Sequence, residues 1–177
     1  MGSGKTTAAN LLVTLLGGAW SRVAFADRLK QTVATFGGVP VSSMYTDSGK
    51  GAMCELTGRT YGQMLQDVGL MFREKFNTEV WIRACLDTSA HTGYGLIIED
   101  VRYENELEAI HKHGGKVIKI VRTKTGTSLS SIAGRDLNHP SETTVDKMVG
   151  DYTVENDSTP KELSDKLEVA LLEFGLI

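Results

Sequence analysis

Short apolar segments alternate with amphipathic segments along this chain, and this alternation limits the folds that it can adopt. The run GLIIED (95–100) stops at two carboxylates, which is typical of a buried parallel strand. The run KVIKIVR (116–122) is a second candidate strand. Helical spacing and glycine stops predict helices at 4–16, 27–37, 61–76, 78–90, 105–115 and 159–175, and the sequence suggests shorter strands at 20–26 and 151–157. We therefore predict an α/β fold with a mainly parallel sheet, which binds ligands at the carboxyl ends of its strands.

The composition fits one domain and excludes several partner classes. The 177 residues suffice for a single core, and a net charge of −3 argues against a general nucleic-acid coat or a polybasic membrane binder. No apolar run approaches the roughly 18–20 residues of a membrane span, and the amino terminus has no signal-peptide pattern. Cys54 and Cys85 fit a reducing compartment and are not spaced as a zinc or redox pair. We expect a cytoplasmic protein without nucleic-acid or membrane partners.

The first residues, MGSGKTT, match the last part of the phosphate-binding pattern G-x-x-x-x-G-K-[ST]. Small residues before a helix let backbone N–H groups surround phosphate oxygens. Lys5 would reach the β- and γ-phosphates, and the Thr6 hydroxyl would ligate Mg²⁺. The alternative is a disordered, glycine-rich start. The first glycine of the pattern would fall before Met1.

Charged residues follow the predicted strands. Asp100 would hold Mg²⁺ through water or orient an acceptor, and Arg102 would bind a phosphate; the alternative is a surface turn with a salt bridge. Lys30 would contact an acceptor phosphate or lie on a solvated helix face.

The middle of the chain offers further candidates. Gln66, with Gly69 three residues later, would read a base edge or be a boundary residue; residues of the type and spacing of Trp81 more often belong to a core. Residues 38–58 are turn-rich and predict a loop or a small helical insertion. Residues 123–144 are polar and resemble a mobile lid, where Arg135 would neutralise charge on the transferred phosphoryl group.

The ordered set of motifs resembles the deoxynucleoside monophosphate kinases of tailed bacteriophages, within the P-loop nucleoside monophosphate kinase group. The motifs are G-S-G-K-T-T, F-A-D-x-L-K, L-Q-x-x-G, V-W-I-R, I-I-E-D-V-R-x-x-x-E, K-V-I-K-I-V-R, H-P-S-E and V-E-N-D-S-T-x-x-E-L. They span nearly the whole chain. The resemblance implies a P-loop NTPase-like parallel sheet, a helical acceptor-binding region (38–90) and a short lid (123–144). It also implies transfer of the γ-phosphate of ATP, with Mg²⁺, to a deoxynucleoside monophosphate in the cytoplasm of a host cell.

The resemblance also assigns roles by matching positions. The ATP-binding positions are Ser3, Gly4, Lys5, Thr6, Thr7, Asn156 and Asp157, with the last two near the adenine. The acceptor-binding positions are Lys30, Gln66, Gly69, Trp81, Asp100, Arg102 and Glu106. This match raises the expectation that Trp81 lines the acceptor pocket.

Two departures from the family pattern affect these expectations. Relatives often have an arginine just before L-Q-x-x-G, where this chain has Gly62-Gln63, so Arg59 would substitute for it. Relatives also have a strand before the phosphate loop. We therefore expect either an upstream start or a chain that folds with a compromised ATP site, in which a strand from a second copy in a homodimer would fill the gap. Two other functions stay open: a dephospho-coenzyme A or phosphomevalonate type of kinase, and a catalytically silent nucleotide-binding protein.

Overall fold

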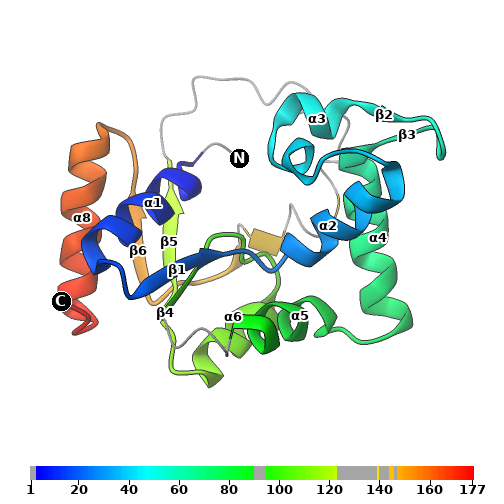
Figure 1. The fold of residues 1–177 in the computed structure, drawn as a ribbon. Coiled ribbons are helices and arrows are strands. Elements are labelled where there is room, and N and C mark those ends of the chain that lie inside the picture. Colours follow the sequence, from blue (N-terminus) through cyan, green and yellow to red (C-terminus); the bar gives the residue numbers. More distant parts are fainter. Residues whose placement is uncertain (1–2, 90–94, 123–138, 140–143, 146) are drawn as a thin grey trace.

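The computed structural model describes residues 3–89, 95–122, 139, 144–145 and 147–177. In chain order (Figure 1), the first elements are α1 (Lys5–Leu16), β1 (Trp20–Val23), α2 (Asp27–Gly37), the 3₁₀ helix η1 (Val41–Tyr45), α3 (Asp47–Gly51), β2 (Met53–Cys54), β3 (Arg59–Thr60) and α4 (Tyr61–Lys75). They are followed by α5 (Val80–Ser89), β4 (Gly95–Ile98), α6 (Glu104–Lys112), β5 (Ile118–Val121), β6 (Tyr152–Glu155) and α8 (Pro160–Glu173).

Two parallel strand pairs form the frame of the molecule. β1 pairs with β4, with Val23 opposite Ile98, and β5 pairs with β6, with Val121 opposite Glu155. Parallel strands need a long crossover connection, and the connection from β1 to β4 contains α2, η1, α3, α4 and α5. The predicted mixed α/β architecture with parallel strand pairing is therefore confirmed.

The described strands form three separate two-stranded sheets, not one continuous sheet. The third sheet is a small antiparallel hairpin, β2–β3, in which Met53 lies opposite Thr60. The sequence predicted a loop or helical insertion at 38–58, and the structure has η1 and α3 there together with β2. The hairpin was not predicted, because strands of two residues are too short to show alternation.

Helices cover the strand pairs and build a separate helical region (Figure 1). α1 and α8 pack with β5 and β6 around Ala8, Val154, Leu163 and Leu167. α5 and α6 pack with β1 and β4 around Phe25, Ile82 and Cys85. The frame thus rests on two apolar clusters, one for each strand pair.

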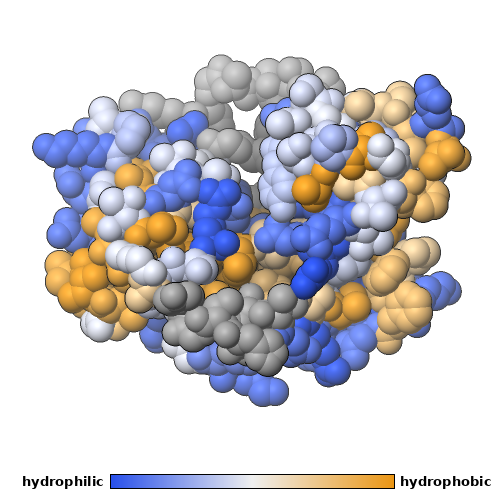
Figure 2. Space-filling view, viewed as in Figure 1, coloured by the Kyte–Doolittle hydropathy of each residue, from blue (hydrophilic) through white to orange (hydrophobic). Residues whose placement is uncertain are grey.

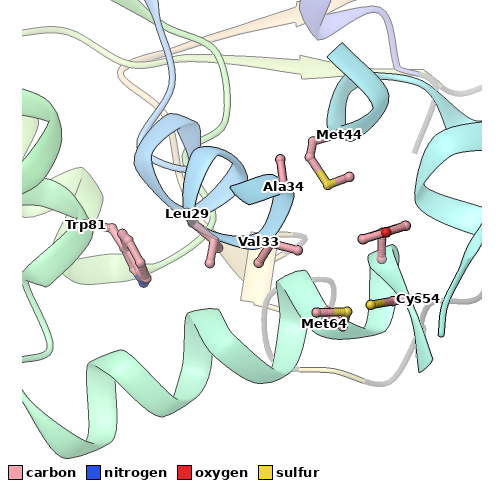
Figure 3. Packing of buried hydrophobic residues seen from close by; sticks show 8 residues of the cluster. Leu29, Val33, Ala34, Met44, Cys54, Met64 and Trp81 are labelled. Carbon is pink, nitrogen blue, oxygen red and sulfur yellow. The ribbon is translucent and has the colours of Figure 1, made fainter. Parts of the chain in front are cut away.

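The third cluster joins α2, η1 and α4 with Trp81 of α5 (Figure 3). Met44 of η1 and Val33 of α2 are 0% and 1% exposed. Thr60 begins α4 with a capping box, since its hydroxyl accepts the N–H of Gln63 and the Gln63 side chain accepts the N–H of Thr60. Apart from α2, this helical region lies within residues 38–90, and its role in binding an acceptor stays a prediction.

The surface in Figure 2 has hydrophilic residues across its middle and hydrophobic patches towards both sides. Of the helices within the described ranges, none combines the length and the apolar character that a bilayer crossing needs.

Candidate functional site

The amino end of α1 is the candidate phosphate loop. Gly4 adopts a left-handed backbone (φ 92°, ψ 20°), and α1 begins at the next residue, Lys5. The Lys5 ammonium donates a hydrogen bond to the Ser3 hydroxyl at 3.2 Å, and Thr6 and Thr7 are exposed in the first helical turn. The first N–H groups of an α-helix have no acceptor within the helix, and the helix dipole favours an anion there. The local structure therefore suits a phosphate group.

Asn156 fastens this loop to the carboxyl end of β6. Its side-chain amide donates to the Ser3 carbonyl at 2.7 Å, although the two residues are 153 positions apart in the sequence. Its own carbonyl accepts a hydrogen bond from Arg122 at 3.1 Å. A Cβ atom on Gly4 would lie 2.2 Å from the Asn156 amide nitrogen, so this contact requires glycine. The resemblance placed Asn156 and Asp157 near the adenine, which stays a prediction, and no sequence signal indicated the contact with Ser3.

Asp100 organises the carboxyl ends of β1 and β4. One carboxylate oxygen accepts the N–H of Phe25 at 2.8 Å and the other accepts the N–H of Ala26 at 3.0 Å. Burial raises the pKa of Asp100, and these two hydrogen bonds and the positive charges of Lys30 and Arg102 oppose part of the rise. The charges of two predicted site residues, Lys30 and Arg102, thus act on a third, Asp100.

Lys30 lies in a cluster that includes two residues outside the predicted site, Asp27 and Tyr45. Its side chain is only 14% exposed, which argues against the solvated helix face. Its ammonium lies 3.5 Å from a carboxylate oxygen of Asp27 and 4.1 Å from the ring centroid of Tyr45. The Tyr45 hydroxyl donates to the same Asp27 oxygen at 2.7 Å. Burial raises the pKa of Tyr45, and this hydrogen bond raises it further. The sequence offered a signal for Asp27, a charged residue at a predicted strand-to-helix turn. It offered none for Tyr45, which lies in the turn-rich segment.

Glu106 is almost fully buried, at 1% exposure. One of its oxygens lies 2.6 Å from a guanidinium nitrogen of Arg73, and the other accepts the N–H of Arg102 at 2.7 Å. Burial raises the pKa of Glu106, and the bonds from Arg102 and Arg73 oppose the rise. In this structure Glu106 therefore contacts the backbone beside the site. Sequence reasoning missed Arg73, which reads as an ordinary basic residue in the last turn of α4.

Trp81 and Gly69 lie in the helical core. Trp81 is 4% exposed, its indole N–H donates to the Gly69 carbonyl at 3.1 Å, and its ring centroid lies 5.2 Å from that of Phe72. A Cβ atom on Gly69 would lie 3.0 Å from a methyl group of Leu29, so glycine lets α2 approach α4 closely. This is the core arrangement that the type and spacing of Trp81 favoured, and its acceptor role stays a prediction.

Arg59 lies in β3, just before α4, whereas Gln66 lies within α4. Arg59 forms an exposed ion pair with Asp67 at 3.1 Å, and both line a mainly apolar cavity of about 440 Å³ between α2 and α4. Gln66 is seven residues before Arg73 in α4, so the two share a helix face. The contact of Arg59 with an acceptor stays a prediction.

Two predicted features lie wholly or largely outside the described residues. Arg135 is one, and most of the lid-like segment 123–144 is the other. Within the part of the chain that is described, no group of three or more His, Cys, Asp or Glu side chains is placed to hold a metal ion.

Comparison with known proteins gives no family assignment. No protein-family model matches this chain, and no curated protein matches it at a significant level.

Proposed function

We propose that this protein transfers the γ-phosphate of ATP to a deoxynucleoside monophosphate, giving the diphosphate. The observation that carries the proposal is the hydrogen bond from Asn156 to Ser3, at 2.7 Å. It holds the candidate phosphate loop at the carboxyl end of a parallel strand, which is the edge where α/β proteins bind their ligands.

The amino end of α1 would bind the ATP phosphates. Lys5 would neutralise charge on the β- and γ-phosphates, and the first-turn N–H groups would hold the phosphate oxygens. A Mg²⁺ ion that arrives with ATP would be held by the Thr6 hydroxyl and the phosphates and would supply further charge neutralisation. The left-handed Gly4 and the Asn156 contact support this role, because they fix the loop before ATP binds.

Lys30 and Arg102 would bind the acceptor phosphate. Both charges act on the buried Asp100, which supports a common location at the ends of β1 and β4. Asp100 would position them through the turn at Phe25 and Ala26, whose N–H groups its two oxygens accept. Gln66 of α4 would contact the base, the role that its spacing from Gly69 suggested.

The reaction itself needs little proton transfer. An ionised oxygen of the acceptor phosphate would attack the γ-phosphorus, and the bond from that phosphorus to the β,γ-bridging oxygen would break, releasing ADP. Because the attacking oxygen is already ionised near neutral pH, positioning and charge neutralisation supply most of the rate. Arg135 would add a positive charge to the transferred group. The homodimer and the cytoplasmic location stay predictions of the sequence.

An ADP-release assay with Mg²⁺ and ATP tests the proposal. The acceptors would be the four common deoxynucleoside monophosphates, AMP, dephospho-coenzyme A and phosphomevalonate. We expect turnover with at least one deoxynucleotide. The rate of ADP release should fall by about 10²-fold or more in Lys5→Met. It should change little in Lys161→Met, a matched substitution on the exposed face of α8. Turnover with dephospho-coenzyme A or phosphomevalonate alone would assign another kinase class. ATP binding without transfer in the folded protein would overturn the proposal in favour of a silent nucleotide-binding protein.

A further inference from the structure

A buried ion pair links the helical region to the strand end that carries Arg102. The side chains of Arg73 in α4 and Glu106 in α6 are 13% and 2% exposed, and their nitrogen and oxygen atoms approach to 2.6 Å. Removing two charges from water is costly, so a buried pair is weak evidence of a contribution to stability. The Arg73–Glu106 pair is therefore better explained by a role other than stabilising the fold.

The second oxygen of Glu106 holds the backbone beside the candidate site. It accepts the N–H of Arg102 at 2.7 Å and the N–H of Tyr103 at 3.2 Å. Two backbone donors on one oxygen fix the orientation of two successive peptide groups. The direction in which the Arg102 side chain leaves the backbone is fixed with them.

Arg73 fixes the position of Glu106 in turn. Its guanidinium carbon lies 4.2 Å from the centroid of the Tyr103 ring, and another of its nitrogens donates to the Thr78 carbonyl at 3.2 Å. Asn105 of α6 donates to the same carbonyl at 3.0 Å. Arg73 therefore contacts the turn before α6 and the connection between α4 and α5 at once, and a planar guanidinium can make these contacts together where an ammonium cannot.

We propose that Arg73 and Glu106 are positioning residues that couple α4 to the turn after β4, so that Arg102 is held in place for an acceptor phosphate. This inference rests on the proposed function for the identity of the ligand. Gln66 lies on the same face of α4 as Arg73, so the same helix would carry the base contact and set the phosphate contact. Neither Arg73 nor Glu106 touches the reacting atoms.

Amide hydrogen exchange without any ligand tests the coupling directly. In Arg73→Met and Glu106→Gln, we expect the Arg102 and Tyr103 amides to exchange at least about tenfold faster relative to the global unfolding rate of each variant. Arg73→Lys keeps the charge and should restore only part of the protection. The matched controls are Arg83→Met and Glu79→Gln, which break an exposed pair between Arg83 of α5 and Glu79 just before it (62% and 50% exposed) and should leave both amides unchanged. Unchanged protection in the Arg73 and Glu106 variants would overturn the proposal, whatever the activity of the protein.

Binding and kinetics test the consequence for the ligand. Titration of a deoxynucleoside monophosphate in the absence of ATP should show affinity falling about 10- to 100-fold in Arg73→Met. In turnover the acceptor KM should rise while the KM for ATP changes less than about twofold, a split that general loss of structure would not produce. If Arg73→Met does not fold, Arg73→Met combined with Glu106→Gln removes both charges and supplies the folded variant. If the wild-type protein has no turnover while the variants still show faster amide exchange, the kinase function is overturned and the coupling is retained. Equal rises in the KM values for the acceptor and for ATP would overturn the positioning role.

Discussion

At the scale of single residues, Gly4 meets two separate demands. Its backbone is left-handed, a conformation that residues other than glycine adopt at a cost in free energy. Its α-carbon also lies against the Asn156 side-chain amide, which leaves no room for a Cβ atom. Gly38, which ends α2, has a similar left-handed backbone (φ 66°, ψ 29°) but nothing within 4 Å of an added Cβ atom. A substitution at Gly38 therefore measures the cost of backbone strain alone, whereas one at Gly4 measures that strain together with the steric contact with Asn156.

Gly38→Ala is expected to lower the free energy of unfolding by about 1–2 kcal/mol, the cost of a left-handed alanine. Gly4→Ala should lower it by about 1 kcal/mol more, because the Asn156–Ser3 hydrogen bond must also shift. Urea unfolding of the two variants beside wild type measures the difference. Equal losses would mean that the Asn156 contact contributes nothing to fixing the loop.

At the scale of elements, one carboxylate joins α6 to both strands of the β5–β6 pair. Asp151, just before β6, accepts the N–H of Val117 at 2.7 Å and the ring nitrogen of His111 lies 3.0 Å from the same oxygen. Burial alone would raise the pKa of Asp151, but these hydrogen bonds and the charges of His111 and Lys116 outweigh it and lower the pKa below its ordinary value.

This lowered pKa makes the contribution of Asp151 depend on pH. The unfolded chain binds the proton more readily than the folded one, so the contribution is complete above the ordinary aspartate pKa, about 3.9, and is lost as pH falls through the folded value. Asp151→Asn should therefore lower the free energy of unfolding at pH 7 by about 1 kcal/mol, and the difference should shrink below about pH 4. Urea unfolding at a series of pH values measures it, with Asp165→Asn on the exposed face of α8 as control. A difference that stays constant down to pH 3 would contradict this account.

The elements also show how far sequence reasoning reaches. The prediction of α2 at 27–37 was correct to the residue, because its apolar face and the glycine after it are local signals. Lys30, Asp100 and Arg102 came from charged residues near predicted strand ends, and in the structure the charges of Lys30 and Arg102 act on Asp100. Arg73, Tyr45 and the Asn156–Ser3 contact were missed because each depends on segments that meet only in the folded chain. Among the described strands, β4 pairs only with β1. This choice of partner also depends on the folded chain and is not encoded in any local pattern.

At the scale of the whole molecule, α1 connects the two parallel strand pairs. Its apolar face packs on β5, β6 and α8 through residues such as Leu12 and Leu15. Its polar face reaches the other pair, where Asn10 accepts a hydrogen bond from Arg22 of β1 and Arg22 lies 3.3 Å from Glu99 after β4. The helical region joins the same frame, since Asp100 binds the turn that begins α2. These links favour unfolding of the whole molecule as one unit.

Leu167→Ala tests that unity from the end of the molecule opposite to Trp81. Leu167 of α8 is 0% exposed, so truncation should lower the free energy of unfolding by about 2–5 kcal/mol, whereas Glu168→Ala, exposed on the same helix, should change it by less than about 0.5 kcal/mol. In a Trp20→Phe background, fluorescence reports Trp81 in the helical core alone. If α1 and Asp100 make the molecule cooperative, the Trp81 transition shifts as far as the far-UV circular dichroism transition. A Trp81 transition that stays at the wild-type midpoint would show that the helical region unfolds independently of the frame.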